Sequence, residues 1–385
     1  MPWKIESVME QRLQFVIEAR QQGATMSELC RRYGISRETG YKWLKRYESK
    51  LRVEALQDQT RRPHHSPQRT SEEQEQKVLA VRDKTGWGAR KIHDVLARTI
   101  KPPPVITIHR ILQRQGRIDP VQASRQASKR FARESCNELA QMDYKGEYPV
   151  AGSGKCYPLT LLDDCSRYLL GLWPLTSTAG EEAQQVLRKQ FRQFGVPQEM
   201  LMDHGTPWCC NSNLHGLTWF SVCLIKQGIT LRYSGVHHPQ TQGKVERLHL
   251  TLKQRTKHRG LPTTMAEWSL WLAEFRYEYN HERPHEALGM KTPSEVYTRD
   301  NLRPYQEQPR EWEYSGGEVR TIDYKGGFTK YGNWYFVSEA LAAERVRVDE
   351  FDDQLVVTFR HLTIRQIDLR KRQSRALLLP AKERK

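Results

Sequence analysis

The strongest constraint on the fold of this 385-residue chain is a change in its hydrophobic periodicity near residue 137. Before that point, apolar residues recur at helical spacing in short runs, which are separated by basic segments without regular pattern. After it, short apolar runs typical of strands alternate with helical runs, and about the last 70 residues alternate apolar and polar side chains. The pattern predicts a multidomain chain: an all-α front, a central α/β domain with a mixed sheet flanked by helices, and a small C-terminal β-barrel.

The first 50 residues predict a helix-turn-helix domain. Helices are expected over 7–22, 26–33 and 37–49, with Gly34 in the turn between the last two. The early residues of the last helix would enter the major groove of DNA. These candidate DNA contacts are Arg37, Glu38, Thr39, Tyr41 and Lys42. An ordinary three-helix bundle with a solvated basic face is the alternative.

A second helix-turn-helix domain is expected over 70–116, after a polar, basic linker at 51–69. Thr70 and Glu73 predict a capping box at the start of its first helix. Its third helix, VITIHRILQRQG, would hold further DNA contacts on its outer surface, namely His109, Arg110 and Arg114. Residues 117–136 are basic and loosely patterned, which predicts a connector.

The distribution of charge indicates which partner these domains take. The chain has 62 basic and 45 acidic residues, a net charge of +17, and residues 1–130 alone contribute +13. A basic excess of this size favours nucleic acid as the partner. No run approaches the roughly 20 apolar residues of a membrane span, and the opening MPWKIESVMEQR lacks the apolar stretch of a secretory signal. We therefore expect a cytoplasmic, nucleoid-associated protein with no membrane partner.

Three carboxylates in the nearly neutral middle of the chain could form a metal site. Asp143 falls in the first predicted strand, Asp203 ends a later strand, and Glu246 lies on the helix that follows. Converging carboxylates are ligands that magnesium prefers, and a two-metal site can activate the attacking oxygen of phosphodiester chemistry. From spacing alone, these acids could equally serve as helix caps and surface charges.

The sequence around each acid resembles a known family. The segments LAQMDYKG, LMDHGTPW and HHPQTQGKVERLHLTLK are similar to the three catalytic motifs of transposases and integrases with a retroviral-integrase core. The segments LLDDCSRYLLG and YNHERPHEALGMKTPSEVY also resemble this group, and the likeness to a bacterial insertion-sequence transposase covers roughly residues 8–370. Two departures are the 42 residues between Asp203 and Glu246, several more than is commonest, and His204, where asparagine commonly follows the second aspartate.

The resemblance implies a fold and a site. It implies a ribonuclease H-like core with a mixed five-stranded sheet over residues 137–300, in which Asp143, Asp203 and Glu246 are the catalytic and metal-binding triad. It further implies two Mg²⁺ or Mn²⁺ ions and a homodimer or higher oligomer on DNA. The β-barrel would occupy 301–370, followed by a flexible basic tail at 371–385.

Residues near Glu246 are candidates for contact with DNA at the active site. Helical geometry places Gln242 and Lys253 on a face similar to that of Glu246, and Lys244 and Arg247 are alternative phosphate contacts. For any single lysine, a solvated helix face is about as good an explanation. Asp163 and Asp164 are expected to stabilise a turn instead of binding metal.

Two other kinds of site are disfavoured. The group His204, Cys209, Cys210, His215 and Cys223 lacks the spacing of a zinc site, so free or buried thiols are expected. The chain has no GxxxxGK[ST] motif, so no nucleotide cofactor is expected.

The expected function is that of a DNA transposase. It would bind the ends of a mobile element, cut DNA in a metal-dependent reaction and join the freed 3′-hydroxyl to target DNA. The alternatives are a non-catalytic helix-turn-helix regulator derived from a transposase, and a nuclease of the same fold that does not join strands.

Overall fold

The computed structural model describes residues 7–21, 23, 25–59, 70–118, 132–152, 154–209, 216–234 and 243–377. The chain divides into two compact units, Met1–Arg69 and Thr70–Lys385. Each unit is described separately below. Within the described residues, no helix is both long and apolar enough to cross a membrane.

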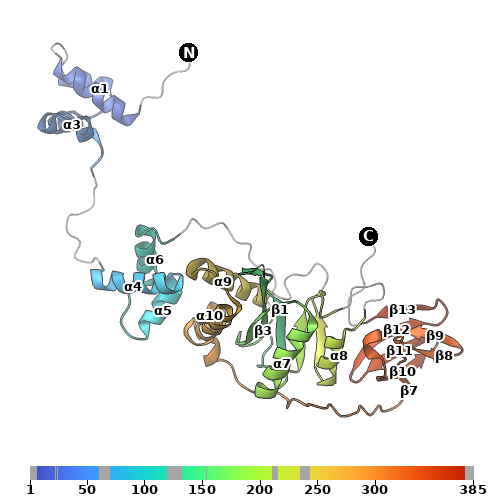
Figure 1. Ribbon diagram of the computed structural model, residues 1–385. Helices are drawn as coiled ribbons and strands as arrows, with labels where there is room; N and C mark the ends of the chain where they lie inside the picture. Colours follow the sequence, from blue (N-terminus) through green and yellow to red (C-terminus); the bar gives the residue numbers. More distant parts are fainter. Residues whose placement is uncertain are drawn as a thin grey trace. The chain divides into compact units, whose positions relative to one another are not determined.

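The first unit is the predicted helix-turn-helix domain (Figure 1). Its helices are α1 (Val8–Arg20), α2 (Met26–Arg32), α3 (Arg37–Lys50) and the 3-10 helix η1 (Val53–Leu56). Ser7, Thr25 and Ser36 cap the three α-helices through their side-chain oxygens. Leu56 is fully buried, and Arg12 donates to its carbonyl oxygen at 2.8 Å. The domain therefore extends into the segment that we predicted to be linker, because its core needs Leu56.

A second three-helix domain begins the second unit, as expected. It contains α4 (Glu72–Thr85), α5 (Ala89–Ala97) and α6 (Val105–Arg114) around a core that includes Val78, Ile92 and Ile108. The predicted capping box at Thr70 is wrong by one residue. Ser71 is the N-cap, and its hydroxyl accepts from the backbone N–H of Gln74.

The central domain is built on a mixed sheet. Its strands are β1 (Leu139–Tyr144), β2 (Tyr148–Val150), β3 (Gly154–Asp163), β4 (Leu169–Leu175), β5 (Glu199–Met202) and β6 (Thr230–Tyr233). The pairings give the order β4-β3-β1-β5-β6, with β1, β5 and β6 parallel and the other pairs antiparallel. Within the described residues the sheet has six strands, not the expected five, because the short β2 pairs with the start of β3.

Helices cover both faces of this sheet. They are α7 (Gly180–Phe194), α8 (Trp219–Lys226), α9 (Gly243–Arg259), α10 (Met265–Tyr277) and the π-helix η3 (Glu278–Glu282), followed by the 3-10 helices η4 (Glu286–Leu288) and η5 (Pro293–Glu295). On β1, Ala140 and Met142 belong to the core that α7 and α8 share. A second core joins β3 and β4 to α9 and α10. Because successive strand side chains point to opposite faces, Gln141 and Asp143 project to the α9 face.

The C-terminal part is all β, as predicted, but its strands do not form a closed barrel within the described residues. A five-stranded antiparallel sheet runs in the order β13-β12-β11-β10-β7, and a separate hairpin joins β8 to β9. The strands are β7 (Glu318–Thr321), β8 (Gly327–Lys330), β9 (Asn333–Phe336), β10 (Arg345–Phe351), β11 (Gln354–Phe359), β12 (Leu362–Asp368) and β13 (Gln373–Ala376), with the 3-10 helix η6 (Glu339–Leu341) after the hairpin. The tail predicted at 371–385 is shorter than expected, because β13 pairs with β12 along four residues. In the part of the chain that the structure describes, β7 and β13 are the two edges of this sheet.

Candidate active site

The first two acids of the site are aligned by the pairing of two parallel strands. β1 pairs with β5 so that Leu139 lies opposite Glu199 and Gln141 opposite Leu201. Continued to the ends of both strands, this register brings Asp143 to the level of Asp203. Asp203 follows β5 directly, and its carboxylate accepts from the backbone N–H of Gly205 at 3.0 Å. Parallel strand ends meet at one edge of the sheet, which explains how acids 60 positions apart come together.

The third acid comes from α9. Glu246 lies in the first turn of this helix and is exposed. Burial, together with the negative charges of Asp203 and Glu246, raises the pKa of Asp143 from 3.8 to about 7. The three carboxylates are therefore electrostatically coupled. Within the described part of the chain, however, no group of three His, Cys, Asp or Glu side chains converges closely enough to hold a metal ion.

His249 adjoins Asp143 and was not predicted. It lies one helical turn after Glu246, is buried, and its Nδ1 is 3.7 Å from Asp143 Oδ2. Burial and the charge of Lys145 lower its pKa to about 3, so the ring is neutral. Thr160 Oγ1 donates to the carbonyl oxygen of Asp143 at 2.8 Å, so it can only accept from His249 Nε2, 3.1 Å away. The proton of His249 is therefore on Nε2. The unprotonated Nδ1 faces the carboxyl group of Asp143, whose pKa is raised.

Lys145 is a second residue that the sequence analysis missed. It follows Asp143 by two positions, and the charge of Asp143 raises its pKa, whereas burial and nearby Lys253 lower it more. Lys145 thus brings a positive charge close to Asp143, and Lys253 lies near Lys145. The spacing of two from Asp143 in the MDYKG segment was the available signal, since alternate strand residues share a face.

Asp163 and Asp164 are structural, in agreement with their predicted turn role. Both are fully buried. Asp163 accepts from the backbone N–H groups of Asn137 and Ser166. Asp164 accepts from the backbone N–H of Arg133 and from Gln141 Nε2, and Lys244 Nζ lies 2.5 Å from its Oδ2.

This ion pair removes Lys244 from the predicted set of phosphate contacts. Its side chain is 13% exposed and also donates to the backbone carbonyl of Asp164 at 2.9 Å. The prediction for Lys244 failed because its position on the helix does not show that the buried carboxylate of Asp164 lies within ion-pair distance. Arg247 and Lys253 remain exposed, and Gln242 lies outside the described residues.

The predicted DNA contacts of the two helical domains are mostly on the surface. Arg37, Glu38, Tyr41 and Lys42 are exposed on α3, whereas Thr39 is half-buried and shares a hydrogen bond of 2.9 Å with Ser36. On α6, the predicted contacts His109, Arg110 and Arg114 are all exposed. Arg114 forms an ion pair with Glu75 at 2.6 Å, so His109 and Arg110 are the two of these residues that have no described ion pair with an acid.

The stretch after Asp203 is only partly described. The ring of His204 packs beside that of Tyr233, with centroids 5.9 Å apart. Cys209 is buried and Cys223 is half-buried. Cys210 and His215, the other members of the disfavoured zinc group, lie outside the described residues.

Comparisons with known proteins agree with this organisation. The family described as Integrase core domain matches residues 133–239 and, in a second form, 227–293. A Helix-turn-helix domain matches 11–64 and a Homeodomain-like domain matches 39–112. The middle of the chain is therefore similar to integrase core domains and its first third to helix-turn-helix domains, and the predicted likeness to integrase-type DDE transposases is confirmed. The bacterial origin stays a prediction.

Individual relatives are distant. The Retrovirus-related Pol polyprotein from transposon 412 of Drosophila melanogaster is 30% identical over 139 residues, which are 36% of this chain and 11% of that protein. This chain thus spans about a tenth of the length of that relative. A chain of the simian T-cell lymphotropic virus intasome in complex with PP2A regulatory subunit B56 gamma is 14% identical, with a TM-score of 0.37, over 79% of this chain and all of that one. The HTLV-2 integrase catalytic core domain in complex with magnesium, in its dimeric form, is 14% identical with a TM-score of 0.31, over 42% of this chain and 97% of that one.

Proposed function

We propose that this chain, with an integrase core behind two helix-turn-helix domains, is a DNA transposase that cuts and joins DNA strands at Asp143, Asp203 and Glu246. The observation that carries the proposal is the coupling of the three acids. They come from two parallel strand ends and one helix, and the charges of Asp203 and Glu246 help to raise the pKa of Asp143. Like charges are gathered at such cost mainly where a function needs them.

The donor set suits a divalent cation. Carboxylate oxygens are the ligands that Mg²⁺ and Mn²⁺ prefer, and a cation would relieve the repulsion that raises the pKa of Asp143. Asp143, Asp203 and Glu246 would hold the metal, with two ions as the proposed number. When bound, such ions supply an activated attacking oxygen and stabilise the leaving oxygen.

The chain's own residues would prepare this site. The backbone N–H of Gly205 orients Asp203. Thr160 and His249 hold the strand end and one side of Asp143. Lys145, beside Asp143, and Lys253, which lies near Lys145, are suited to the phosphates of the DNA strand that is cut.

DNA recognition would fall to the helical domains. The exposed early residues of α3 suit the major groove, and His109 and Arg110 on α6 suit a second contact with the same duplex. Two linked modules raise each other's effective concentration on DNA without any new contact. Because two element ends must be joined to one target, we propose that a homodimer or higher oligomer assembles on the DNA.

One reaction tests the proposal. Purified protein is incubated with labelled element-end duplex, supercoiled target plasmid and Mg²⁺ or Mn²⁺, and the products are resolved on gels. We expect joined products that disappear in Asp143→Asn, Asp203→Asn and Glu246→Gln but persist in Glu181→Gln, which changes an exposed acid on α7. Cutting without joining would favour a nuclease, and DNA binding without metal-dependent cutting would favour a regulator.

A further inference from the structure

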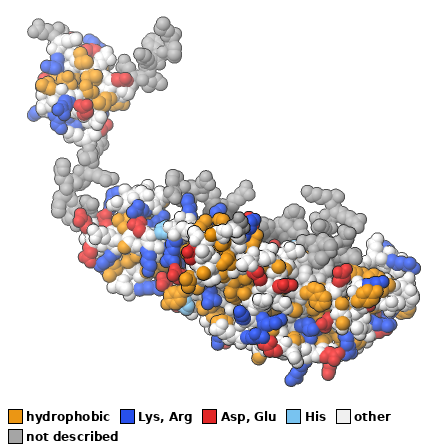
Figure 2. All heavy atoms as spheres, in the orientation of Figure 1, with side chains coloured by type: hydrophobic (Ala, Val, Ile, Leu, Met, Phe, Trp, Pro, Cys, Tyr) orange, Lys and Arg blue, Asp and Glu red, His pale blue; other side chains and the backbone are white. Residues whose placement is uncertain are grey.

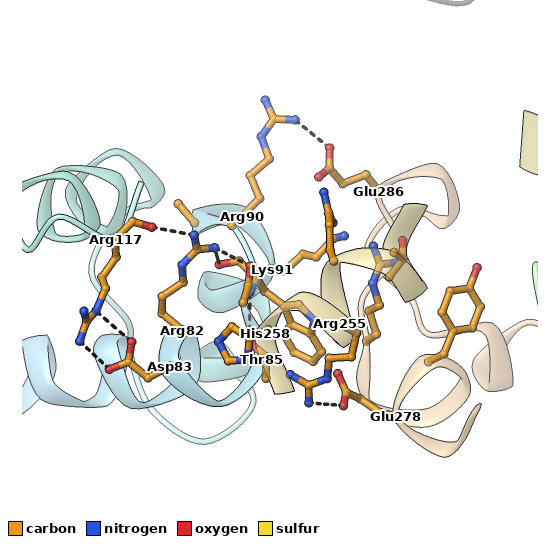
Figure 3. Close-up of a pocket in the computed structure, with 18 of the residues that line it drawn as sticks. Arg82, Asp83, Thr85, Arg90, Lys91, Arg117, Arg255, His258, Glu278 and Glu286 are labelled. Carbon is orange, nitrogen blue, oxygen red and sulfur yellow. Dashed lines mark hydrogen bonds and ion pairs between the residues drawn. The ribbon is translucent and has the colours of Figure 1, made fainter. Parts of the chain in front are cut away.

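A cleft of about 1290 Å³ lies within the second unit, between its three-helix domain and helices α9 and α10 (Figure 3). Its lining contains eight Lys or Arg side chains and three acidic ones. In the space-filling view, Lys and Arg side chains gather where the two parts meet (Figure 2). None of the three proposed catalytic acids lines this cleft.

The acids of the cleft are already paired. Asp83 binds Arg117 at 3.0 Å, Glu278 binds Arg255 at 2.5 Å, and Glu286 binds Arg90 at 3.5 Å (Figure 3). Five further cations line the cleft without an ion pair to any described carboxylate, namely Arg82, Lys91, Arg247, Lys257 and Arg283. Among these, Lys91, Arg247 and Arg283 lie close enough to affect one another's pKa.

These three cations repel one another in a partly buried setting. Burial and the charges of Arg283 and Arg247 lower the pKa of Lys91 to about 8, although the charge of Glu286 opposes this shift. Burial and Arg247 also lower the pKa of Arg283. The Nε of Arg283 is buried without a hydrogen-bond partner in the described structure. Uncompensated positive charge of this kind destabilises a free protein and favours a bound anion.

The start of α5 adds hydrogen-bond donors to the same wall. Gly88, its N-cap residue, makes no side-chain cap, and the first turn of the helix contains no acid. Gly88, Ala89 and Arg90 all line the cleft. The free N–H groups and positive end of a helix attract phosphate.

We propose that this cleft binds a phosphate of the DNA backbone, held by Lys91, Arg247, Arg283 and the start of α5. The inference rests on the proposed function, because it assigns the anion to DNA. Arg247 directly follows Glu246 on α9. A phosphate in the cleft would therefore link the second helical domain to the helix that carries the third acid, and would fix where the DNA enters the active site.

The test compares Lys91→Ala and Arg247→Ala with Lys77→Ala in the full chain. Lys77 is a matched control, because it pairs with Glu73 on the surface of α4, and neither residue lines the cleft. Binding to a random-sequence duplex is measured by fluorescence anisotropy at several salt concentrations. Loss of one phosphate contact should weaken binding about 3- to 10-fold and reduce the slope of log Kd against log salt by about one. Lys77→Ala should match the wild type in both.

A stability measurement excludes a merely structural effect. Because Lys91 is repelled by its neighbours, Lys91→Ala should have a Tm no lower than that of the wild type while binding DNA less well. A lower Tm together with weaker binding would count against the inference.

A second experiment identifies the phosphate. A duplex that the protein selects from a random pool is prepared with single phosphates replaced by neutral methylphosphonates. If Lys91 contacts one particular phosphate, replacing that phosphate and mutating Lys91→Ala should together reduce DNA affinity by less than the sum of their separate reductions.

The outcomes separate this inference from the proposed function. If both cleft variants bind DNA with wild-type affinity and salt slope, the cleft inference is overturned and DNA binding stands. If the wild type binds no DNA, both fail. A rise in Tm with inorganic phosphate that Lys91→Ala abolishes, with unchanged DNA affinity, would assign the cleft to a small anion and overturn the DNA assignment.

Discussion

Two aspartates of the central domain, the half-buried Asp143 and the fully buried Asp164, have opposite electrostatic surroundings. Asp143 lies near two other acids and beside a neutral histidine. Asp164 accepts two hydrogen bonds and pairs with Lys244. The first carboxylate is destabilised in the charged form, and the second is stabilised by partners that surround it. Replacing each residue should therefore change the stability of the fold with opposite signs.

Asp143→Asn should stabilise the metal-free protein at neutral and higher pH. The pKa of Asp143 is about 7 in the folded chain against 3.8 ordinarily. Between these values the folded state keeps a proton that the unfolded state has lost, so stability falls as the pH rises from about 4 to 7. The variant escapes this penalty, which is at most about 4 kcal/mol because one pKa unit corresponds to about 1.4 kcal/mol.

Thermal unfolding at pH 4, 6 and 8 in the presence of a chelator measures this effect. The two proteins should match at pH 4, and the variant should have the higher Tm at pH 8. Added Mg²⁺ should raise the Tm of the wild type more than that of the variant. A variant that is less stable than the wild type at pH 8 would contradict the electrostatic explanation.

Asp164→Ala should destabilise the central domain strongly. The change leaves the ammonium of Lys244 buried without its carboxylate and removes acceptors from Arg133 N–H and Gln141. Breaking a buried ion pair from one side costs about 3–5 kcal/mol. The Tm of the full chain reports the loss, with Glu181→Ala as a surface control. A change as small as that of the control would show that water replaces Asp164 around Lys244.

At the scale of elements, most helix and strand positions follow from local sequence. The Ser7, Thr25 and Ser36 caps mark where the first three helices start. The error at Thr70 shows the limit of this reasoning: Thr70 and Ser71 are both good caps, and only the path of the chain selects Ser71.

Gly40→Ala tests a close approach between elements. In an open helix this change would stabilise by up to about 1 kcal/mol. A Cβ on Gly40 would instead lie 2.6 Å from Cys30 Sγ and 2.9 Å from Phe15 Cζ, so the packing of α1 and α2 against α3 must shift. We expect a loss of about 1–3 kcal/mol, measured as faster hydrogen exchange of α3 amides. Gly88→Ala, with nothing within 4 Å of the new Cβ, is the matched control and should change stability little. Unchanged exchange in Gly40→Ala would mean that the three helices are loosely packed.

At the scale of the whole molecule, the second unit does not divide at the domain boundary near residue 300. One apolar cluster contains Phe220 and Leu224 of α8 together with Val337 and Leu341 of the β domain. Lys226 also pairs with Glu344 at 2.7 Å, and Arg360 donates to the carbonyl of Lys226. The central and β domains therefore share a core, which sequence patterns of each domain taken alone could not indicate.

Two fragments should differ sharply for this reason. Residues 70–385 form one compact unit and should keep their Tm when 1–69 are removed. Residues 1–310 lose part of the shared core and should unfold at least about 10 °C lower or precipitate. Thermal unfolding followed by circular dichroism compares them. A stable, soluble 1–310 fragment would show that the β domain contributes little to the stability of the core.

The sequence by itself determined the modular order and most element positions, because periodicity, caps and motif segments are local properties. It also predicted the three acids, whose role stays a proposal. It also indicated that Asp163 and Asp164 stabilise a turn. Only the tertiary structure decided which neighbours each charge meets. Lys244 is bound to a buried carboxylate 80 positions away, whereas Arg247, three positions later, lines a cleft with Lys91. His249 lies beside Asp143 because α9 packs on β1. These outcomes depend on contacts between distant segments, and side chains of the same type and spacing take different roles because burial and nearby charge differ at each position.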